Sequence, residues 1–444
     1  MSEHMPGKRG GGPGRPVAFG ADDLSWLVGL MDRNTVTPLE GGEPVALAEA
    51  QELFVAGAEQ RGFTLRELSA PPASFLDRAG VPAQVLDAVG GNADAFLRAQ
   101  PSAVLALGRA QAPARRVVFN FHMDTVGPHL PPRLAGGVLH GRGAVDDKGA
   151  GVAAVLGTAA AFAEDPSLAE DVEVLVTSVP GEEGGAMGVY GTRWLVESGH
   201  TGRLMIFAEP TGGLVLDACS AAMTPRVTVS GLDSTDDHPY DGHNATLALG
   251  MAACHLAEVL GPLADRLGAK VCLSGLHTGT AHNRVYGTGE LRLNIAYYDL
   301  SAARELAAAV ERAVPDVAAR LGRRYGDNPV ARRLAQDWEQ VVRLDWLKRD
   351  LPPLSNRDEE MESLLAGAGL PRHDGTSDGT AFTCDAIWAA APDRYVVACG
   401  PGRLDLNGAH TAEEHVAVRD LEVYAGQCRD LVRRFGAWAR SGRT

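Results

Sequence analysis

Short apolar runs recur through residues 116–208 and alternate with segments whose apolar residues have helical spacing. Such runs are typical of strands that are buried on both faces of a parallel sheet. We expect strands at 117–121, 172–177 and 204–208, with helices at 148–163 and 192–197 between them. Strands and helices that alternate in this way predict an α/β fold, a mostly parallel sheet flanked by helices with right-handed crossovers.

The order of elements changes near residue 222. Four strands and two helices are expected there, in the order β-α-β-β-α-β, at 225–230, 246–260, 270–274, 288–298, 301–321 and 341–346. This order is that of an α+β ferredoxin-like domain. A helix at 358–367, a strand at 395–399 and a helix at 411–435 then resume the first pattern.

These changes of pattern predict one domain inserted into another. Residues 21–221 and 353–444 would form the α/β domain, and residues 222–352 the inserted α+β domain. A chain of 444 residues is long enough for two domains. Residues 1–20, rich in Gly, Pro and Arg, are expected to form a flexible tail, and residues 70–115 to include an insertion.

Composition narrows the classes of partner. The formal net charge is -15, whereas a nucleic-acid or anionic-membrane partner would favour a basic face. We therefore expect neither partner, and the sequence shows no apolar run of the roughly 18 residues that span a bilayer. The six cysteines lack C-x-x-C spacing, which favours reduced thiols in a cytoplasmic protein.

Five short motifs carry side chains that bind metals. They are His122-x-Asp124, the run 140–149 with Asp146 and Asp147, Glu182-Glu183, Glu209-Pro210, and His410-Thr411 at the expected start of the last helix. Four of them follow expected strands or the loops that those strands feed. Loops at the carboxyl ends of parallel strands converge, so we expect these side chains to lie close together.

Each motif has a plainer interpretation when it is taken alone. Asp146 or Asp147 suits a helix N-cap, adjacent glutamates usually face solvent, and His410 suits a surface. The five motifs together, however, supply a suitable number of ligands for two metal ions. Two histidines and three carboxylates can hold two cations if one carboxylate is shared, and zinc accepts such a mixture. A fourth carboxylate, from the Glu182-Glu183 pair, would stay free to take a proton from water.

The ordered motifs H-x-D, G-x-G-A-x-D-x-K-G, E-E-G, E-P and A-H-T-x-x-E resemble the family of acetylornithine deacetylase and succinyl-diaminopimelate desuccinylase. This family of di-zinc metallopeptidases also includes aminoacylases and glutamate carboxypeptidases. The resemblance covers roughly residues 22–435. It implies two divalent metal ions, zinc before cobalt or manganese, and a lid in the inserted domain that often forms a dimer contact.

The resemblance also implies a role for each motif residue. A hydroxide held by the two metals would attack an amide carbonyl, with a glutamate as general base. The implied roles are His122 and Glu209 as ligands of the first metal, Asp124 as the partner that orients His122, Asp146 as the bridging ligand, Glu182 as the base, and Glu183 and His410 as ligands on the second-metal side.

The lid segment departs from the family pattern. Thr235 stands where the family has an oxyanion-binding His, and His238 or His243 would have to substitute for it, whereas Asn283 matches the family's lid Asn. Two arginines that grip a substrate carboxylate in the family are replaced by other residues. They are Ala296, in Asn294-Ile-Ala-Tyr297, and Thr380, after Gly375-Thr-Ser-Asp-Gly379.

The leading hypothesis is therefore hydrolysis of a small amide, by a deacylase or dipeptidase that forms a homodimer through the lid and acts on a substrate without the usual carboxylate. Two alternatives remain. The metal site could serve amide formation or a lyase-like reaction, or the chain could bind a ligand without catalysis.

Overall fold

A computed structural model describes residues 15–40, 46–373, 375–376 and 381–442. The chain divides into two compact units, Met1–Cys219 with Leu354–Thr444 (unit 1) and Ser220–Pro353 (unit 2). The boundaries expected from the sequence, at 221/222 and 352/353, lie close to these. At the two crossings the strands β8 (Ala218–Cys219) and β15 (Leu354–Ser355) pair, with Leu354 opposite Cys219.

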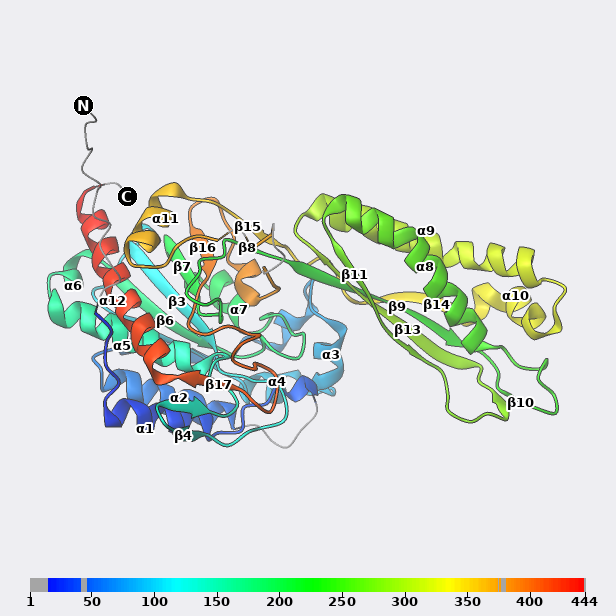
Figure 1. The fold of residues 1–444 in the computed structure, drawn as a ribbon, viewed down its shortest axis with the longest axis horizontal. Helices are drawn as coiled ribbons and strands as arrows, with labels where there is room; N and C mark the ends of the chain where they lie inside the picture. The colour runs from blue at the N-terminus through cyan, green and yellow to red at the C-terminus, as the bar shows by residue number, and fades with distance from the viewer. Residues whose placement is uncertain (1–14, 41–45, 374, 377–380, 443–444) are drawn as a thin grey trace, which may run out of the picture. The chain divides into compact units, whose positions relative to one another are not determined.

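A six-stranded sheet forms the centre of unit 1 (Figure 1). Its spatial order is β1 (Thr64–Ser69), β2 (Ser102–Leu107), β6 (Glu173–Val179), β3 (Arg116–His122), β7 (Leu204–Phe207) and β16 (Tyr395–Ala398). The last four strands are parallel, whereas β1, β2 and β6 pair in antiparallel fashion. The expected α/β class, with a mostly parallel sheet flanked by helices, is confirmed.

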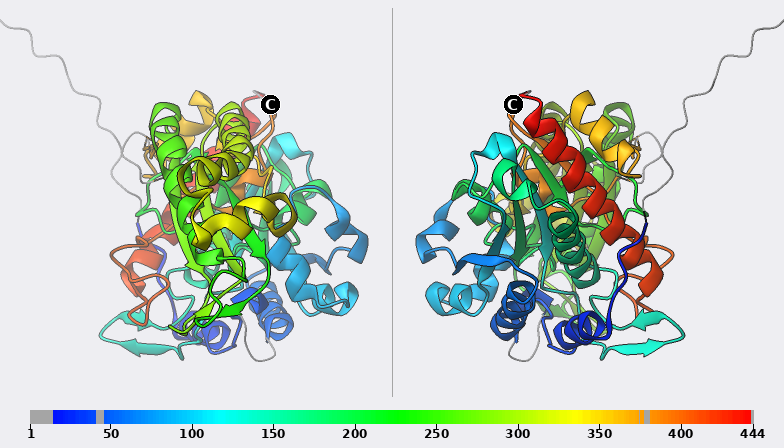
Figure 2. Two further views of the ribbon diagram at one scale, coloured as in Figure 1. Left: turned by 90° about the vertical axis from the view of Figure 1, so that its right-hand side faces the viewer. Right: turned by 90° about the vertical axis from the view of Figure 1, so that its left-hand side faces the viewer.

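Helices pack on this sheet through one large apolar core. They include α1 (Ala21–Met31), α2 (Leu47–Glu59), α5 (Lys148–Glu164) and α12 (Val418–Arg440). Helix α12, in red, lies along α5 (Figure 2, right). Small residues permit this closeness: a Cβ built on Gly157 of α5 would lie 2.2 Å from the carbonyl oxygen of Ala425 in α12.

Residues 70–115 are not only an insertion. They contain the 3-10 turn η2 (Ala73–Asp77), helices α3 (Ala83–Val89) and α4 (Ala93–Arg98), and β2 of the central sheet. The first three surround a small second core, with Leu76, Val85 and Leu97 buried. Helix α7 (Thr192–Glu197) and helix α11 (Glu359–Gly367) occur where the sequence predicts them.

Unit 2 has a four-stranded antiparallel sheet in the order β11 (Lys270–His277), β13 (Thr288–Tyr297), β9 (Ala221–Ser230) and β14 (Val342–Lys348). Helices α8 (Ala245–Leu267) and α9 (Leu300–Tyr325) complete the predicted β-α-β-β-α-β order. The sequence does not predict α10 (Pro329–Val341), which precedes β14.

Helix α8 is long and apolar enough, by length and composition alone, to cross a membrane. Its apolar face packs within unit 2: Leu249, Leu256 and Leu260 are buried where α8 contacts α9 and the sheet.

The structure bears on two expectations about the chain ends. The expected flexible tail, residues 1–20, falls mostly outside the described residues, but its described part packs on α12: the Val17 amide donates to the Glu422 carbonyl over 3.0 Å. The last helix begins at Val418 and not at residue 411. Gly408 and His410 have positive φ angles, of 63° and 64°, and residues 415–417 form β17, which pairs with β5 (Val138–His140).

Candidate metal centre

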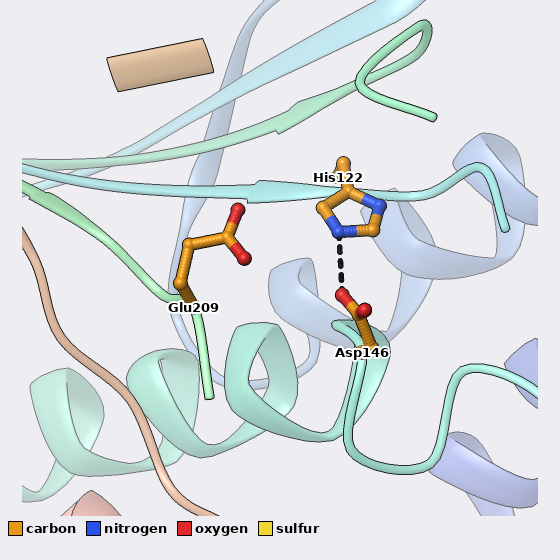
Figure 3. A group of neighbouring side chains, drawn as sticks. All are labelled: His122, Asp146 and Glu209. Carbon is orange, nitrogen blue, oxygen red and sulfur yellow. Dashed lines mark hydrogen bonds and ion pairs between the residues drawn. The ribbon is translucent and has the colours of Figure 1, made fainter. Parts of the chain in front are cut away.

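Three of the expected ligands converge at the carboxyl ends of the parallel strands. His122 ends β3, Glu209 follows β7, and Asp146 lies in the loop before α5. Figure 3 shows the three side chains pointing toward one another. One ligand atom from each lies within 4.8 Å of the others, and all three residues are buried. His122 Nε2 is 2.9 Å from Asp146 Oδ1.

A second group shares Asp146 with the first. His410 Nε2 is 3.0 Å from Asp146 Oδ2 and 3.1 Å from Glu183 Oε1. The two oxygens of Asp146 therefore face two different histidines, whose residues are 288 positions apart in the chain, since His122 and His410 lie on opposite sides of the insertion. This arrangement suits a carboxylate that bridges two cations.

Glu182 belongs to the same centre. A ligand atom of Glu182 lies within 4.8 Å of those of His122 and Glu183. The loop that carries both glutamates turns at Gly181, where φ is 75° and a Cβ would lie 2.4 Å from the ring of Tyr190. A glycine is required there because a side chain would fit neither the backbone nor the space.

Asp124 contacts His122 through its backbone carbonyl and the Glu182-Glu183 loop through its carboxylate, whereas the sequence predicted that its carboxylate orients His122. Its backbone carbonyl, and not its carboxylate, lies 2.8 Å from His122 Nδ1, while the carboxylate is 3.9 Å away. A proton on Nδ1 that is donated to this carbonyl leaves Nε2 as the ring nitrogen for a metal. The buried carboxylate instead accepts the backbone N–H groups of Glu182 and Glu183, over 3.3 and 3.1 Å.

Burial and close charges perturb the pKa values of the metal-free centre. Hydrogen bonds to Asp146 and Glu183 raise the pKa of His410 to about 10. Burial and the charge of Glu183 hold the pKa of Glu182 well above its usual range, and burial does the same for Glu209. Burial opposes ionisation of Asp146, but its hydrogen bonds to His122 and His410 prevail and lower its pKa.

An ion pair holds the loop that carries Asp146. Arg142 Nη1 donates to Glu414 Oε2 over 2.5 Å, and both side chains are buried. The other oxygen of Glu414 lies 3.3 and 3.4 Å from the backbone N–H groups of Val145 and Asp146. Glu414 thus ties the segment after His410 to the expected bridging ligand.

No role for Glu414, Cys384 or Asp385 was predicted from the sequence. Glu414 occurs in the A-H-T-x-x-E motif, which was a signal that could have been followed. Cys384 and Asp385 had no comparable signal, yet their ligand atoms lie within 4.8 Å of Glu209 and of each other.

The residues expected to bind the substrate or the oxyanion, Thr235, His238 and Asn283, lie in unit 2. Thr235, in β10 (Ser234–Thr235), pairs with Arg284, next to Asn283, and Thr235 and Asn283 are both exposed. His238 is exposed as well, 3.9 Å from Asp241.

His243 has a structural environment. It is buried, its Nδ1 accepts the Leu232 N–H over 2.8 Å, and its Nε2 lies 3.0 Å from Asp337. Of the two histidines considered as substitutes at the Thr235 position, His243 is therefore already engaged within unit 2.

Of the two positions where the family has an arginine, the structure describes Ala296 but not Thr380. Ala296 lies on β13 opposite Lys270 and Ala222, on the sheet face that does not carry the buried Leu293 and Ile295. Thr380 and Asp378 lie outside the described residues, as does Gly379, whereas Gly375 packs near Ala381.

The donor set fits divalent cations. The groups around Asp146 combine imidazole nitrogens with carboxylate oxygens, and these carboxylates are buried, so their ionised forms need a counter-charge. Of the described residues around the centre, Asp147 has both carboxylate oxygens buried without a hydrogen-bond partner.

Comparison with known proteins agrees with this geometry. Residues 118–434 match peptidase family M20/M25/M40. The chain belongs to this family. Members of the M20 family are metallopeptidases, so the family implies divalent metal ions, and the chain is an amide-bond hydrolase.

Curated relatives of the chain include a hydrolase and desuccinylases. The chain is 34% identical over 176 residues to a protein of Aeropyrum pernix described as a LysW-lysine/LysW-ornithine hydrolase, a match that covers 40% of this chain and 46% of that relative. It is 28% identical over 318 residues to succinyl-diaminopimelate desuccinylase of Xanthomonas euvesicatoria, which covers 68% of this chain and 77% of the relative.

Solved structures of the M20 fold extend over nearly the whole chain. Aminopeptidase PepT from Bacillus cereus aligns with a TM-score of 0.65 at 15% identity and covers 93% of this chain and 98% of its own. Human carnosine dipeptidase 1 aligns with a TM-score of 0.61 at 12% identity and covers 94% of this chain and 97% of its own. At these identities the likeness concerns the fold alone.

Proposed function

We propose that this chain hydrolyses an amide bond in a small N-acyl amino acid, dipeptide or related amide, with two divalent cations and Glu182 as the general base. The first cation would be held by His122, Asp146 and Glu209, and the second by Asp146, Glu183 and His410. The observation that carries the proposal is the position of Asp146, whose two oxygens face the two histidines at 2.9 and 3.0 Å.

The cations would be zinc, or cobalt or manganese, since all three accept nitrogen and carboxylate donors. When bound, such a pair would polarise a carbonyl and lower the pKa of a bound water molecule toward neutrality. The protein contributes position, since His122 is fixed by the Asp124 carbonyl and the Glu182-Glu183 loop by the Asp124 carboxylate.

Glu182 is suited to move a proton. It is the carboxylate of the adjacent pair that does not face His410, and burial with the charge of Glu183 raises its pKa. A carboxylate that holds no cation would take a proton from water and return it to the departing nitrogen. General acid–base catalysis of this kind contributes about 10²–10⁴-fold in rate.

The substrate is proposed to lack the free carboxylate that arginines hold in related enzymes. Ala296 and Thr380 stand at the two expected arginine positions, and Thr235 at the expected histidine position. Thr235 pairs with Arg284, which directly follows Asn283, and the exposed polar groups of Thr235 and Asn283 would bind a substrate oxygen. A homodimer through unit 2 is part of the same proposal.

The test is metal content per chain together with turnover on N-acyl amino acids, dipeptides and carboxylate-free amides. Two cations per chain, and cleavage that falls at least about 100-fold in Glu182→Gln with the metal content unchanged, are expected. The control is Glu413→Gln, an exposed glutamate beside Glu414. Two cations with no cleavage of any amide would contradict hydrolysis. Product formation from an added amine would then favour amide synthesis.

A further inference from the structure

A further group of metal-binding side chains lies beside the two groups described above. Ligand atoms of Glu209, Cys384 and Asp385 all lie within 4.8 Å of one another, and all three residues are buried. Glu209 follows β7, whereas Cys384 and Asp385 enter the 3-10 turn η4 (Asp385–Trp388) from the second segment of unit 1. Glu209 therefore belongs to two groups, as Asp146 does.

Asp385 carries an unsatisfied acceptor. One carboxylate oxygen, Oδ2, accepts a hydrogen bond from the Thr192 hydroxyl, which fixes the side chain. The other, Oδ1, is buried without a hydrogen-bond partner in the described chain, although the residue is only 1% exposed. A buried acceptor that is left unpaired costs free energy, so it needs a proton, a water molecule or a cation.

The electrostatic surroundings of Asp385 favour a cation. Among the groups that act on it are the carboxylates of Asp124 and Asp147, and the latter has both oxygens buried and unpartnered among the described residues. His122 is the opposing positive group. Arg142 and Lys148, the buried cationic side chains nearest in sequence to Asp147, are engaged with Glu414 and the Leu30 carbonyl.

The thiol of Cys384 lies beside the thiol of Cys219, with 3.5 Å between the two sulfur atoms. A thiol–thiol contact is a weak hydrogen bond, so it does not explain why a sulfur atom faces Glu209 and Asp385. As a thiolate, sulfur is a strong ligand for zinc, cobalt and cadmium, and a poor one for magnesium or calcium.

We propose that Glu209, Cys384 and Asp385 form an additional binding position for a thiophilic divalent cation, adjacent to the two-cation centre. The position rests on the proposed function only in that Glu209 is shared with the first-metal group. Binding forms a sulfur–metal bond and releases the Cys384 thiol proton to solvent, with no change of oxidation state. Zinc, cobalt and cadmium are the expected cations.

Cobalt(II) titration of the chelator-treated full chain, under a phosphine reductant that keeps both thiols reduced, tests the position. Cobalt bound to a thiolate has a charge-transfer band in the near ultraviolet, which carboxylate and imidazole ligands do not produce. We expect this band in the wild type and its loss in Cys384→Ser, together with a decrease of one bound cobalt per chain. In Cys219→Ser the band is expected to remain.

Three results would overturn the position: no band in the wild type, a band that persists in Cys384→Ser, or loss of the band without loss of a cobalt ion. In the last case Cys384 only supplements the first-metal group. Cys399→Ser is a matched control, since this thiol is also buried but is absent from the candidate metal-binding groups among the described residues. Circular dichroism checks that each variant folds.

The same titration separates this position from the proposed function. Glu182→Gln is expected to keep the charge-transfer band while it loses turnover, because Glu182 does not belong to the Cys384 group. His410→Ala is expected to lose one cobalt ion without losing the band. Failure of the hydrolase hypothesis would therefore leave the thiolate signal unchanged, and absence of the signal would leave hydrolysis unaffected.

Discussion

Arg142 and Glu414, which are 272 residues apart in the chain, form a buried ion pair with 2.5 Å between Nη1 and Oε2. The pair joins the loop before α5 to the segment after His410, and Glu414 also accepts the backbone N–H groups of Val145 and Asp146. Asp146, the proposed bridging carboxylate, therefore depends on a residue that has no proposed contact with metal.

Glu414→Ala is expected to lower the free energy of unfolding by about 3–5 kcal/mol, because it leaves the Arg142 charge buried and unpaired. Metal affinity should fall by about 10–100-fold, as is typical when a residue that orients a ligand is removed. Chemical denaturation and metal titration measure the two effects. Arg109→Ala is the control, since it breaks an exposed ion pair with Glu170 of 2.9 Å and should cost at most about 1 kcal/mol. Equal losses in the two variants would contradict the argument.

Stabilisation by metal is expected to increase with pH. Hydrogen bonds to Asp146 and Glu183 raise the pKa of His410 to about 10 in the metal-free chain. The stability that this raised pKa provides is complete below the unfolded value of about 6.5 and is lost as pH rises toward about 10. Glu182 and Glu209 act in the same direction, because a buried carboxyl with a raised pKa destabilises the folded state once it ionises.

The measurement is the difference in Tm between metal-loaded and chelator-treated protein, followed from about pH 6.5 to pH 9. The difference should grow across this range, since the cations replace the protons that the metal-free centre loses. The growth should be smaller in His410→Ala. A difference that stays constant or shrinks as pH rises would show that these groups do not control the stability of the metal-free centre.

Packing of α12 on α5 gives a third prediction. Gly157→Ala should destabilise the protein by about 1–3 kcal/mol, because the added Cβ would lie 2.2 Å from the Ala425 carbonyl oxygen and 2.8 Å from Cys428 Cβ. Gly250→Ala, in α8, is the matched control. Nothing lies within 4 Å of its added Cβ, so the higher helix propensity of alanine should stabilise by about 0.5–1 kcal/mol. Denaturant midpoints of the two variants should therefore move in opposite directions.

The two histidines of the β10 region are expected to differ. His243→Ala should destabilise unit 2 by about 1–3 kcal/mol, because the Leu232 N–H and Asp337 each lose a partner. His238→Ala, at an exposed position, should change stability by less than about 0.5 kcal/mol. Hydrogen exchange resolved to unit 2 measures both. A larger loss of stability in His238→Ala than in His243→Ala would contradict the structural role given to His243.

Much of the fold could be predicted because burial leaves a local signal. The run 117–121 became β3, since a strand covered on both faces is continuously apolar. Strand β1 gave no such signal, because it is an edge strand with alternately exposed residues. Helix α10 was missed although it carries a local signal: its buried residues Ala331, Leu334, Trp338 and Val341 have helical spacing, and Asn328 caps it just before Pro329.

The site likewise has residues that the sequence predicted and features that it did not. His122, Asp146, Glu183, Glu209 and His410 were predictable because each lies in a recognisable motif, and the structure brings them together. The backbone at His410 was not, because a positive φ and the short strand β17 depend on pairing with β5. Glu414 stands in the A-H-T-x-x-E motif, but its ion pair with Arg142, like the approach of Cys384 to Glu209, is a contact between distant segments that no local pattern encodes.

The division of unit 1 into two chain segments also sets an order of events during synthesis. When the ribosome has produced the chain through unit 2, His122, Asp146, Glu183 and Glu209 are present, but β16, α12, Glu414 and His410 are not. The nascent centre would then expose carboxylates that lack their later partners, with the β7 edge of the sheet still unpaired. The proposed ligands of the first cation are therefore all made before unit 2, whereas those of the second cation are complete only when His410 has been synthesised.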